Sequence, residues 1–277
     1  MRKSIIISCI ILLLTAQVRA HDDEKDTITI TMPRLRLGVE AGISTFFGKI
    51  NKPAMIRESQ SYYYDNDYDY NCGFVPEEQG YQFFYFGLKP EYQLNDRIAV
   101  AAGLRFSFNK IILDSDRDYF LWKISETETS TNYVKINDIS QKNYYIGVPI
   151  EAKVFTNPHD YFVRHYFIMG TVFNFLLSSS NDVSFQNAGM NKYTSDVSAQ
   201  IGKPNGFCGQ LYAGCGLKIG KTNHPFGNIE FHFPIYIYGK DKSNSFAKMN
   251  DTFGIGIQTT LQIPIFREHK LTYTVID

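Results

Sequence analysis

The stretch FGIGIQTTLQI, residues 253–263, alternates large apolar residues with glycine, glutamine and threonine. Successive side chains of an extended chain point to opposite faces, so the odd-numbered residues share one face and the even-numbered residues the other. One face is then mainly apolar from Phe253 to Ile263, and the opposite face is small or polar. The stretch predicts a β-strand that separates an apolar from a polar environment.

The same alternation recurs along the chain and predicts eight strands. They cover residues 35–43, 83–94, 98–108, 144–154, 161–177, 207–219, 229–238 and 253–263. Strand 161–177 is apolar on both faces, so its orientation stays open. An all-β fold follows.

The connections between these strands alternate between long and short. The long ones are residues 48–80, 112–142, 178–205 and 240–251, and the short ones are 95–96, 156–160 and 221–227. Outer-membrane barrels sort their connections in this way, with short periplasmic turns, longer outer loops and an even number of strands. We therefore expect an eight-stranded antiparallel transmembrane β-barrel of the outer-membrane type. A soluble periplasmic barrel is the alternative, with its apolar face turned inward.

The charged residues of the strands share the face opposite the apolar one. Because a charge on the lipid face costs a few kcal/mol, roughly 2–4 at mid-bilayer, we expect these residues to face the lumen, which is the barrel interior. There they would pair as a polar plug rather than line a pore. This predicted charge network comprises Arg36, Glu40, Lys89, Glu91, Arg105, Glu151, Lys153, Lys218 and Glu230. Inward glycines would give its long side chains room.

The first twenty residues predict export. Arg2 and Lys3 precede an apolar run and a small-residue cleavage site, the pattern of a signal peptide over residues 1–20. Residues 21–33 would be a periplasmic N-terminal segment, 34–266 the barrel and 267–277 a periplasmic tail or a longer last strand. Cleavage leaves 25 basic against 28 acidic residues, a net charge of −3, which argues against a nucleic-acid partner.

Three cysteines remain in the exported chain, so at most one internal disulfide can form. Cys208 and Cys215 lie on opposite faces of one strand and cannot pair. A Cys72–Cys208 disulfide would tie the first long loop over the barrel, and three free thiols are the alternative. We expect Cys215 to face lipid.

The run YYYDNDYDYNC, residues 62–72, begins like a calcium-binding loop. The match fails at Tyr70, because the sharp turn of a calcium loop requires glycine there, and at Pro76, because a calcium loop has a bidentate glutamate at that position. We expect no metal site here, but an exposed recognition or shielding surface in the first outer loop.

His232 is predicted to face the lumen, with Glu230 on the same face. Some small outer-membrane barrels modify lipid A with a histidine, a serine and a carboxylate. Such a site needs the three groups within hydrogen-bond reach, and nothing in the sequence brings the inward Ser107 to His232. We therefore predict a structural histidine, no catalytic residue and no cofactor.

The segments RLGVEAGIS (36–44) and YIGVPIEAKV (145–154) resemble the PorT-like outer-membrane β-barrel proteins of the Bacteroidetes. The resemblance covers roughly residues 34–266, with a glycine-rich first strand and the Val148-Pro149-Ile150 pattern inside the barrel. It implies fold and location, and no functional residue.

These features predict a non-enzymatic, monomeric outer-membrane barrel that acts structurally or through its outer loops. Segments 119–124 and 131–136 would extend the sheet above the membrane. Expected partners are outer-membrane lipid and lipopolysaccharide, with a protein partner at loops 48–80, 112–142 and 178–205. A lipid-modifying enzyme and an accessory subunit of a secretion or uptake complex are the alternatives.

Overall fold

The computed structural model describes residues 25–32, 35–49, 53–57, 75, 78–126, 131–157, 161–222, 224–238, 246, 253–265 and 269–276. The chain divides into two compact units. One is Pro33–Phe266, and the other combines Met1–Met32 with Arg267–Asp277. The predicted signal peptide, residues 1–20, lies outside the described residues.

The smaller unit is a two-stranded antiparallel ribbon. Strand β1 (Lys25–Met32) pairs with β14 (His269–Ile276), so that Lys25 lies opposite Ile276 and Met32 opposite His269. Neither strand is among the eight predicted ones, although isoleucine and threonine alternate in the ITIT of β1. The segment after the barrel therefore contains a separate strand and does not prolong β13.

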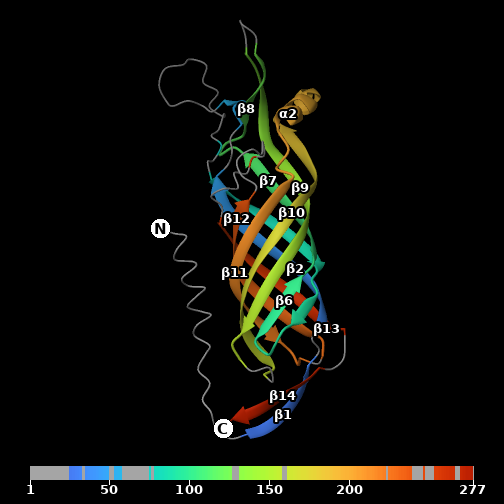
Figure 1. Cartoon of the computed structure of the whole chain (residues 1–277). Coiled ribbons are helices and arrows are strands. Elements are labelled where there is room, and N and C mark those ends of the chain that lie inside the picture. The colour runs from blue at the N-terminus through green and yellow to red at the C-terminus, as the bar shows by residue number, and fades with distance from the viewer. Residues whose placement is uncertain are drawn as a thin grey trace. The chain divides into compact units, whose positions relative to one another are not determined.

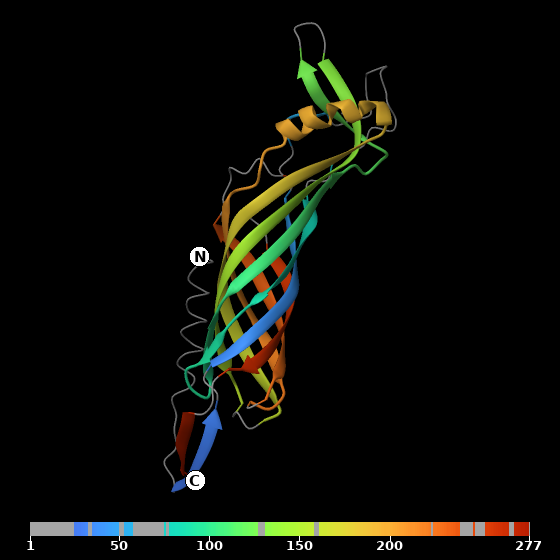
Figure 2. The same ribbon diagram turned by 90° about the vertical axis from the view of Figure 1, so that its right-hand side faces the viewer.

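The larger unit is a closed antiparallel ring of strands (Figures 1 and 2). Strands β2 and β13 pair with each other, which closes the ring, and β4–β5 and β6–β7 each occupy one position, which leaves eight positions. All eight predicted strands are present. Their bounds are β2 (Leu35–Lys49), β4 (Glu78–Leu88), β5 (Glu91–Gln93), β6 (Ile98–Ala102), β7 (Leu104–Asp114), β9 (Thr131–Phe155), β10 (Val163–Phe185), β11 (Phe207–Ile219), β12 (Phe226–Tyr238) and β13 (Phe253–Pro264).

Two ring positions are interrupted, at Pro90 and at Gly103, where the chain remains hydrogen-bonded to its neighbours. Ala102 N donates to Pro90 O at 3.2 Å, and Gly103 N donates to Pro149 O at 3.2 Å. A Cβ at Gly103 would lie 2.0 Å from Leu88 O, so only glycine allows this close approach of two backbones.

The two faces of the ring have opposite chemistry, as predicted. Outward side chains are apolar and exposed, among them Phe86, Phe233 and Ile255. Inward side chains are buried and polar through most of the ring, and all nine predicted network residues are among them. Strand β10, left unoriented by its sequence, turns Phe167 and Met169 outward and Arg164 and Tyr166 inward. A soluble barrel would show the inverse arrangement.

Beyond one end of the ring, β7, β9 and β10 continue as a structured sheet (Figures 1 and 2). We call residues 111–126, 131–142 and 178–201 the strand extension. It includes β8 (Phe120–Glu126), which pairs with β9, and β8 also pairs with the short β3 (Ile56–Arg57). The prediction that 119–124 and 131–136 extend the sheet is confirmed.

The long connections predicted at 112–142 and 178–205 are wrong in extent, because much of their length is strand or helix. Strand β10 runs to Phe185 and is followed by a 3₁₀ helix η1 (Ala188–Tyr193) and by α2 (Thr194–Gln200). No helix in the described part of the chain is long and apolar enough to cross a membrane.

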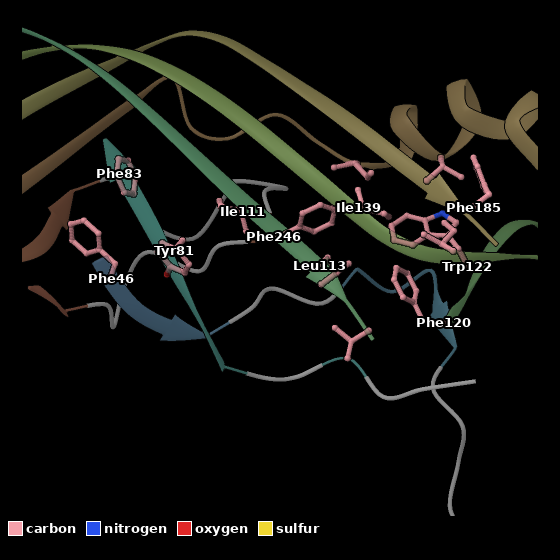
Figure 3. Close-up of a cluster of buried hydrophobic side chains, with 14 of the residues drawn as sticks. Phe46, Tyr81, Phe83, Ile111, Leu113, Phe120, Trp122, Ile139, Phe185 and Phe246 are labelled. Carbon is pink, nitrogen blue, oxygen red and sulfur yellow. The ribbon is translucent and has the colours of Figure 1, made fainter. Parts of the chain in front are cut away.

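The strand extension has its own apolar core, which continues into the adjacent end of the lumen (Figure 3). Trp122, Phe120, Ile136 and Ile139 are fully buried, and Val197 of α2 packs into the same cluster. The Trp122 indole Nε1 donates to Gln200 Oε1 at 2.6 Å, which fastens α2 to β8. Burial of these large side chains makes the extension a folded element, since each contributes roughly 1.5–3 kcal/mol of transfer free energy.

Candidate functional site

Lys89 is the centre of the lumen charge network. Its ammonium lies 2.6 Å from Glu151 Oε2, 2.9 Å from Glu40 Oε2 and 3.8 Å from Glu230 Oε2. Arg105 closes the other side of Glu40 with a bidentate pair, at 2.7 Å through Nε and 3.0 Å through Nη2. Every one of these side chains is at most 6% exposed, so each charge is compensated by its ion-pair partners and not by water.

The network continues toward the end of the barrel that carries the short turns, which we call the turn end. Lys153 lies 2.7 Å from Glu230 Oε1 and 3.1 Å from Glu91 Oε2. Arg36 Nη1 then donates to Glu91 Oε1 at 3.1 Å and to Gln93 Oε1 at 2.8 Å. Eight of the nine predicted residues thus form one continuous set of ion pairs.

Lys218, the ninth predicted residue, makes no ion pair among the described residues. Its ammonium donates to Thr222 Oγ1 at 2.6 Å and lies 4.3 Å from the centre of the Phe226 ring. Arg164 is a further lumen cation, on the strand whose orientation its sequence left open. Ile168 and Val172 also point inward there and hide the alternation of β10. Arg164 donates to the carbonyl oxygens of Asp96 and Asn157.

Many contacts across the lumen pass over an inward glycine on the intervening strand. Glu40 of β2 and Arg105 of β7 both lie opposite Gly87 of β4 in the strand register, and they bond across it. A Cβ at Gly87 would lie 2.3 Å from Leu104 O and 3.2 Å from Glu40 Oε1. Glycine is therefore needed so that side chains two strands apart can meet.

The same arrangement occurs at four other glycines. In each case, the two bonded residues both lie opposite the glycine in the register. The sets are Ser44–Gly256–His232, Tyr85–Gly42–Gln258, Tyr212–Gly170–Glu151 and Tyr166–Gly216–Glu230. Gly42, Gly87, Gly216 and Gly256 were expected from the sequence to face inward, whereas Gly170 lies on the strand whose orientation stayed open. Each of the five glycines leaves room for one pair of side chains to bond across it.

His232 is inward and 4% exposed, as predicted for a lumen histidine. Its Nε2 lies 3.3 Å from Ser44 Oγ and 3.3 Å from the Tyr85 hydroxyl. The nearby serine is Ser44 and not Ser107, a pairing that depends on the register of β2, β13 and β12. His232 Nδ1 has no hydrogen-bond partner among the described residues, so no carboxylate orients the ring there as an acid–base pair requires.

The cysteines lie in different environments. Cys208 is buried in the apolar cluster, Cys215 is exposed on the outward face as predicted, and both are free thiols in this structure. Cys72 and the run at 62–72 lie outside the described residues. Within the described residues, no group of three or more His, Cys, Asp or Glu could hold a metal ion.

Aromatic side chains occupy the lumen between the charge network and the strand extension. The ring of Phe46 lies 4.8 Å from that of Tyr236 and 5.3 Å from that of Phe83, centre to centre. Tyr145 adds to this layer 6.3 Å from Phe83. These buried rings and the ion pairs occupy successive levels of the lumen, as expected for a barrel of eight strands, whose interior is just wide enough for side chains.

A scan against protein-family models and a search of curated proteins both find no match. Among solved structures, the chain is similar to the N-terminal β-barrel domain of Pseudomonas aeruginosa OprF. The identity is 10%, the match covers 84% of this chain and 100% of the other, and the TM-score is 0.32. It is also similar to Ail, the attachment invasion locus protein of Yersinia pestis, at 11% identity, with 83% and 99% covered and a TM-score of 0.31. From its own closed ring, apolar exterior and polar interior, the chain is an eight-stranded antiparallel β-barrel of the outer-membrane type.

Proposed function

We propose that this protein is a non-enzymatic outer-membrane barrel that anchors a folded platform, the strand extension, at the cell surface for contact with a partner. The observation that carries the proposal is the strand extension itself. Its apolar core and its helix make it a shaped surface, whereas a disordered loop would have no such core.

The exterior of the ring supports insertion into a bilayer. From β2 to β13 the outward positions are occupied by residues such as Phe84, Ile150, Phe231 and Leu261, whose exposed fractions are 47%, 48%, 50% and 51%. Lipid would cover these side chains on insertion. A contiguous apolar surface of this kind would drive aggregation in water, and a bilayer would cover it.

The interior supports a structural role for the barrel. The ion pairs around Lys89 and the aromatic layer at Phe46 and Tyr236 occupy successive levels of the lumen. Such packing fits a plugged anchor, and we propose that the barrel serves to hold the strand extension and not to conduct ions.

The strand extension supports the interaction role. Its buried side holds Trp122 and Val197, while its outer surface carries exposed polar residues such as Ser180 and Asp182. Asp182 accepts a hydrogen bond from Lys142 across β9 and β10. With lipopolysaccharide and outer-membrane lipid around the barrel, this surface would meet a protein partner, either as a surface contact or within a secretion or uptake complex, as the PorT-like resemblance would allow.

A photo-crosslinking experiment in native outer membranes tests the proposal. A photoreactive residue is placed at exposed positions 180 and 192 of the strand extension, with position 224 at the turn end as the matched control. We expect one recurrent protein to crosslink from 180 and 192 and not from 224. Recovery of the same products from all three positions, or of none from the strand extension, contradicts an interaction role for this surface.

A further inference from the structure

We propose that the turn end of the lumen is a binding site for a small oxyanion, with Arg36 as the bidentate donor and Lys218 as the second cation. Phosphate and carboxylate share the required chemistry. The site lies apart from the strand extension, so it does not depend on the proposed surface interaction.

Arg36 has one free edge. Both of its described hydrogen bonds to side chains, to Glu91 and Gln93, use Nη1, while Nε and Nη2 are buried without a partner. Nε and Nη2 form the edge of a guanidinium that binds two oxygens of one anion side by side. Arg105 shows the same edge in use, since its Nε and Nη2 hold the two oxygens of Glu40.

Buried cations outnumber buried carboxylates in the lumen even when Arg164, which binds backbone carbonyl oxygens, is left aside. Among the described residues, the five other buried cations face four buried carboxylates. The carboxylates are Glu40, Glu91, Glu151 and Glu230, and three of them lie within 3.8 Å of Lys89. Positive charge therefore accumulates at Arg36 and Lys218, and an anion there would offset the cost of burying it.

Phe226 places the two cations at one site. The Lys218 ammonium lies 4.3 Å from the centre of its ring, and the Arg36 guanidinium carbon lies 5.2 Å from the same centre. Lys218 is 1% exposed and finds no carboxylate among the described residues. Its remaining donors are available to the anion that Arg36 would hold.

Neighbouring positions add further unpaired polar atoms. Gln262 lies opposite Phe226 in the register, is fully buried, and has no hydrogen-bond partner for Nε2 or Oε1 in the described structure. Asn228 lies opposite both Lys218 and Thr260, and its Oδ1 and the Thr260 Oγ1 are likewise unpaired. Buried polar atoms are rarely left unpaired, so a cluster of them on adjacent strands marks a place for a polar ligand.

The test uses the full chain folded in detergent micelles. Binding is measured by titration calorimetry, and the unfolding temperature is followed while phosphate replaces chloride at constant ionic strength. A second series uses acetate, which separates a phosphate ligand from a carboxylate ligand. We expect saturable binding of one of these oxyanions and a rise in the unfolding temperature that chloride does not give.

Two variants locate the site. Arg36→Lys keeps the positive charge but removes the two parallel N–H donors of the guanidinium. Lys218→Gln removes the second cation. Each change should weaken anion binding about tenfold. Lys203→Gln, an exposed change near the strand extension, should leave affinity unchanged. If Arg36→Lys does not fold, Lys218→Gln alone decides. Equal stabilisation by all salts, or unchanged affinity in Lys218→Gln, overturns the proposal.

Discussion

The guanidinium of Arg105 binds the carboxylate of Glu40 across Gly87, with Nε 2.7 Å from Oε1 and Nη2 3.0 Å from Oε2. The two residues come from strands that do not pair with each other, since β4 lies between β2 and β7. Their contact needs a glycine on β4 at the level where they meet. Five such contacts across a glycine occur among the described residues, so the inward glycines and the polar side chains of the lumen depend on one another.

Replacing Gly87 by alanine tests whether the ion pair of Glu40 and Arg105 depends on the glycine between them. Its new Cβ would lie 2.3 Å from the backbone oxygen of Leu104, so the strands or the ion pair must shift. We expect a loss of about 1–3 kcal/mol in the free energy of unfolding, measured by denaturant titration in lipid vesicles. Gly80→Ala is the control on the same strand, because the nearest atom lies 3.7 Å away. Equal losses in the two variants would contradict the role given to Gly87.

Removing the buried charge of Glu40 should lower the free energy of unfolding more than removing a charge on an exposed side chain. Glu40→Gln leaves Arg105 and Lys89 short of a carboxylate in a buried site, and we expect a loss of about 3–5 kcal/mol in the free energy of unfolding. Asp182→Asn breaks the exposed pair with Lys142 and should give no measurable change. A similar stability in both variants would show that the lumen pairs do not hold the barrel.

The strand extension should unfold separately from the ring when its core is weakened. Phe120→Ala removes a fully buried ring next to Trp122 and should cost the strand extension about 3–5 kcal/mol. Trp122 is the single tryptophan of the chain, so its emission reports on this core directly. We expect a red-shifted emission with heat-modifiable barrel migration retained, and little change in the neighbouring control Leu121→Ala. Loss of barrel migration together with the emission shift would show one cooperative unit.

The prediction that this protein is not an enzyme is tested at His232. Ser44 and His232 are buried in the lumen, and the second ring nitrogen of His232 is unpaired in the described structure. We expect mass spectrometry of lipid A to give the same profile for His232→Gln, for Ser44→Ala and for the unaltered protein. A lipid A modification that disappears in both variants would establish the enzyme alternative.

The sequence predicted the strands and the faces of this barrel well, because both depend on local alternation. Period-two patterning located all eight ring strands. The alternation of long and short connections favoured a membrane barrel, and in such a barrel charged residues such as Lys153 and Glu151 must face inward, as they do. The orientation of strand β10 could not be predicted in this way, because the inward Ile168 and Val172 pack with Tyr212 and make both faces of the strand apolar.

Contacts between distant strands could not be predicted, because they depend on register. Ser44 meets His232 only because both lie opposite Gly256, which no local pattern specifies. The strand extension was only partly predicted, since α2 is seven residues long and owes its position to packing of Val197 and to the bond between Gln200 and Trp122.

Cysteine accessibility in cells tests the central claim, a membrane-spanning barrel with the strand extension outside, most directly. Single cysteines are introduced by Ser180→Cys, Ile257→Cys and His224→Cys in a chain whose own cysteines are replaced by serine or alanine. A membrane-impermeant maleimide should label position 180 in intact cells, position 224 only after the outer membrane is permeabilised, and position 257 in neither case. Labelling of 224 but not 180 in intact cells, or ready labelling of 257, would contradict the account.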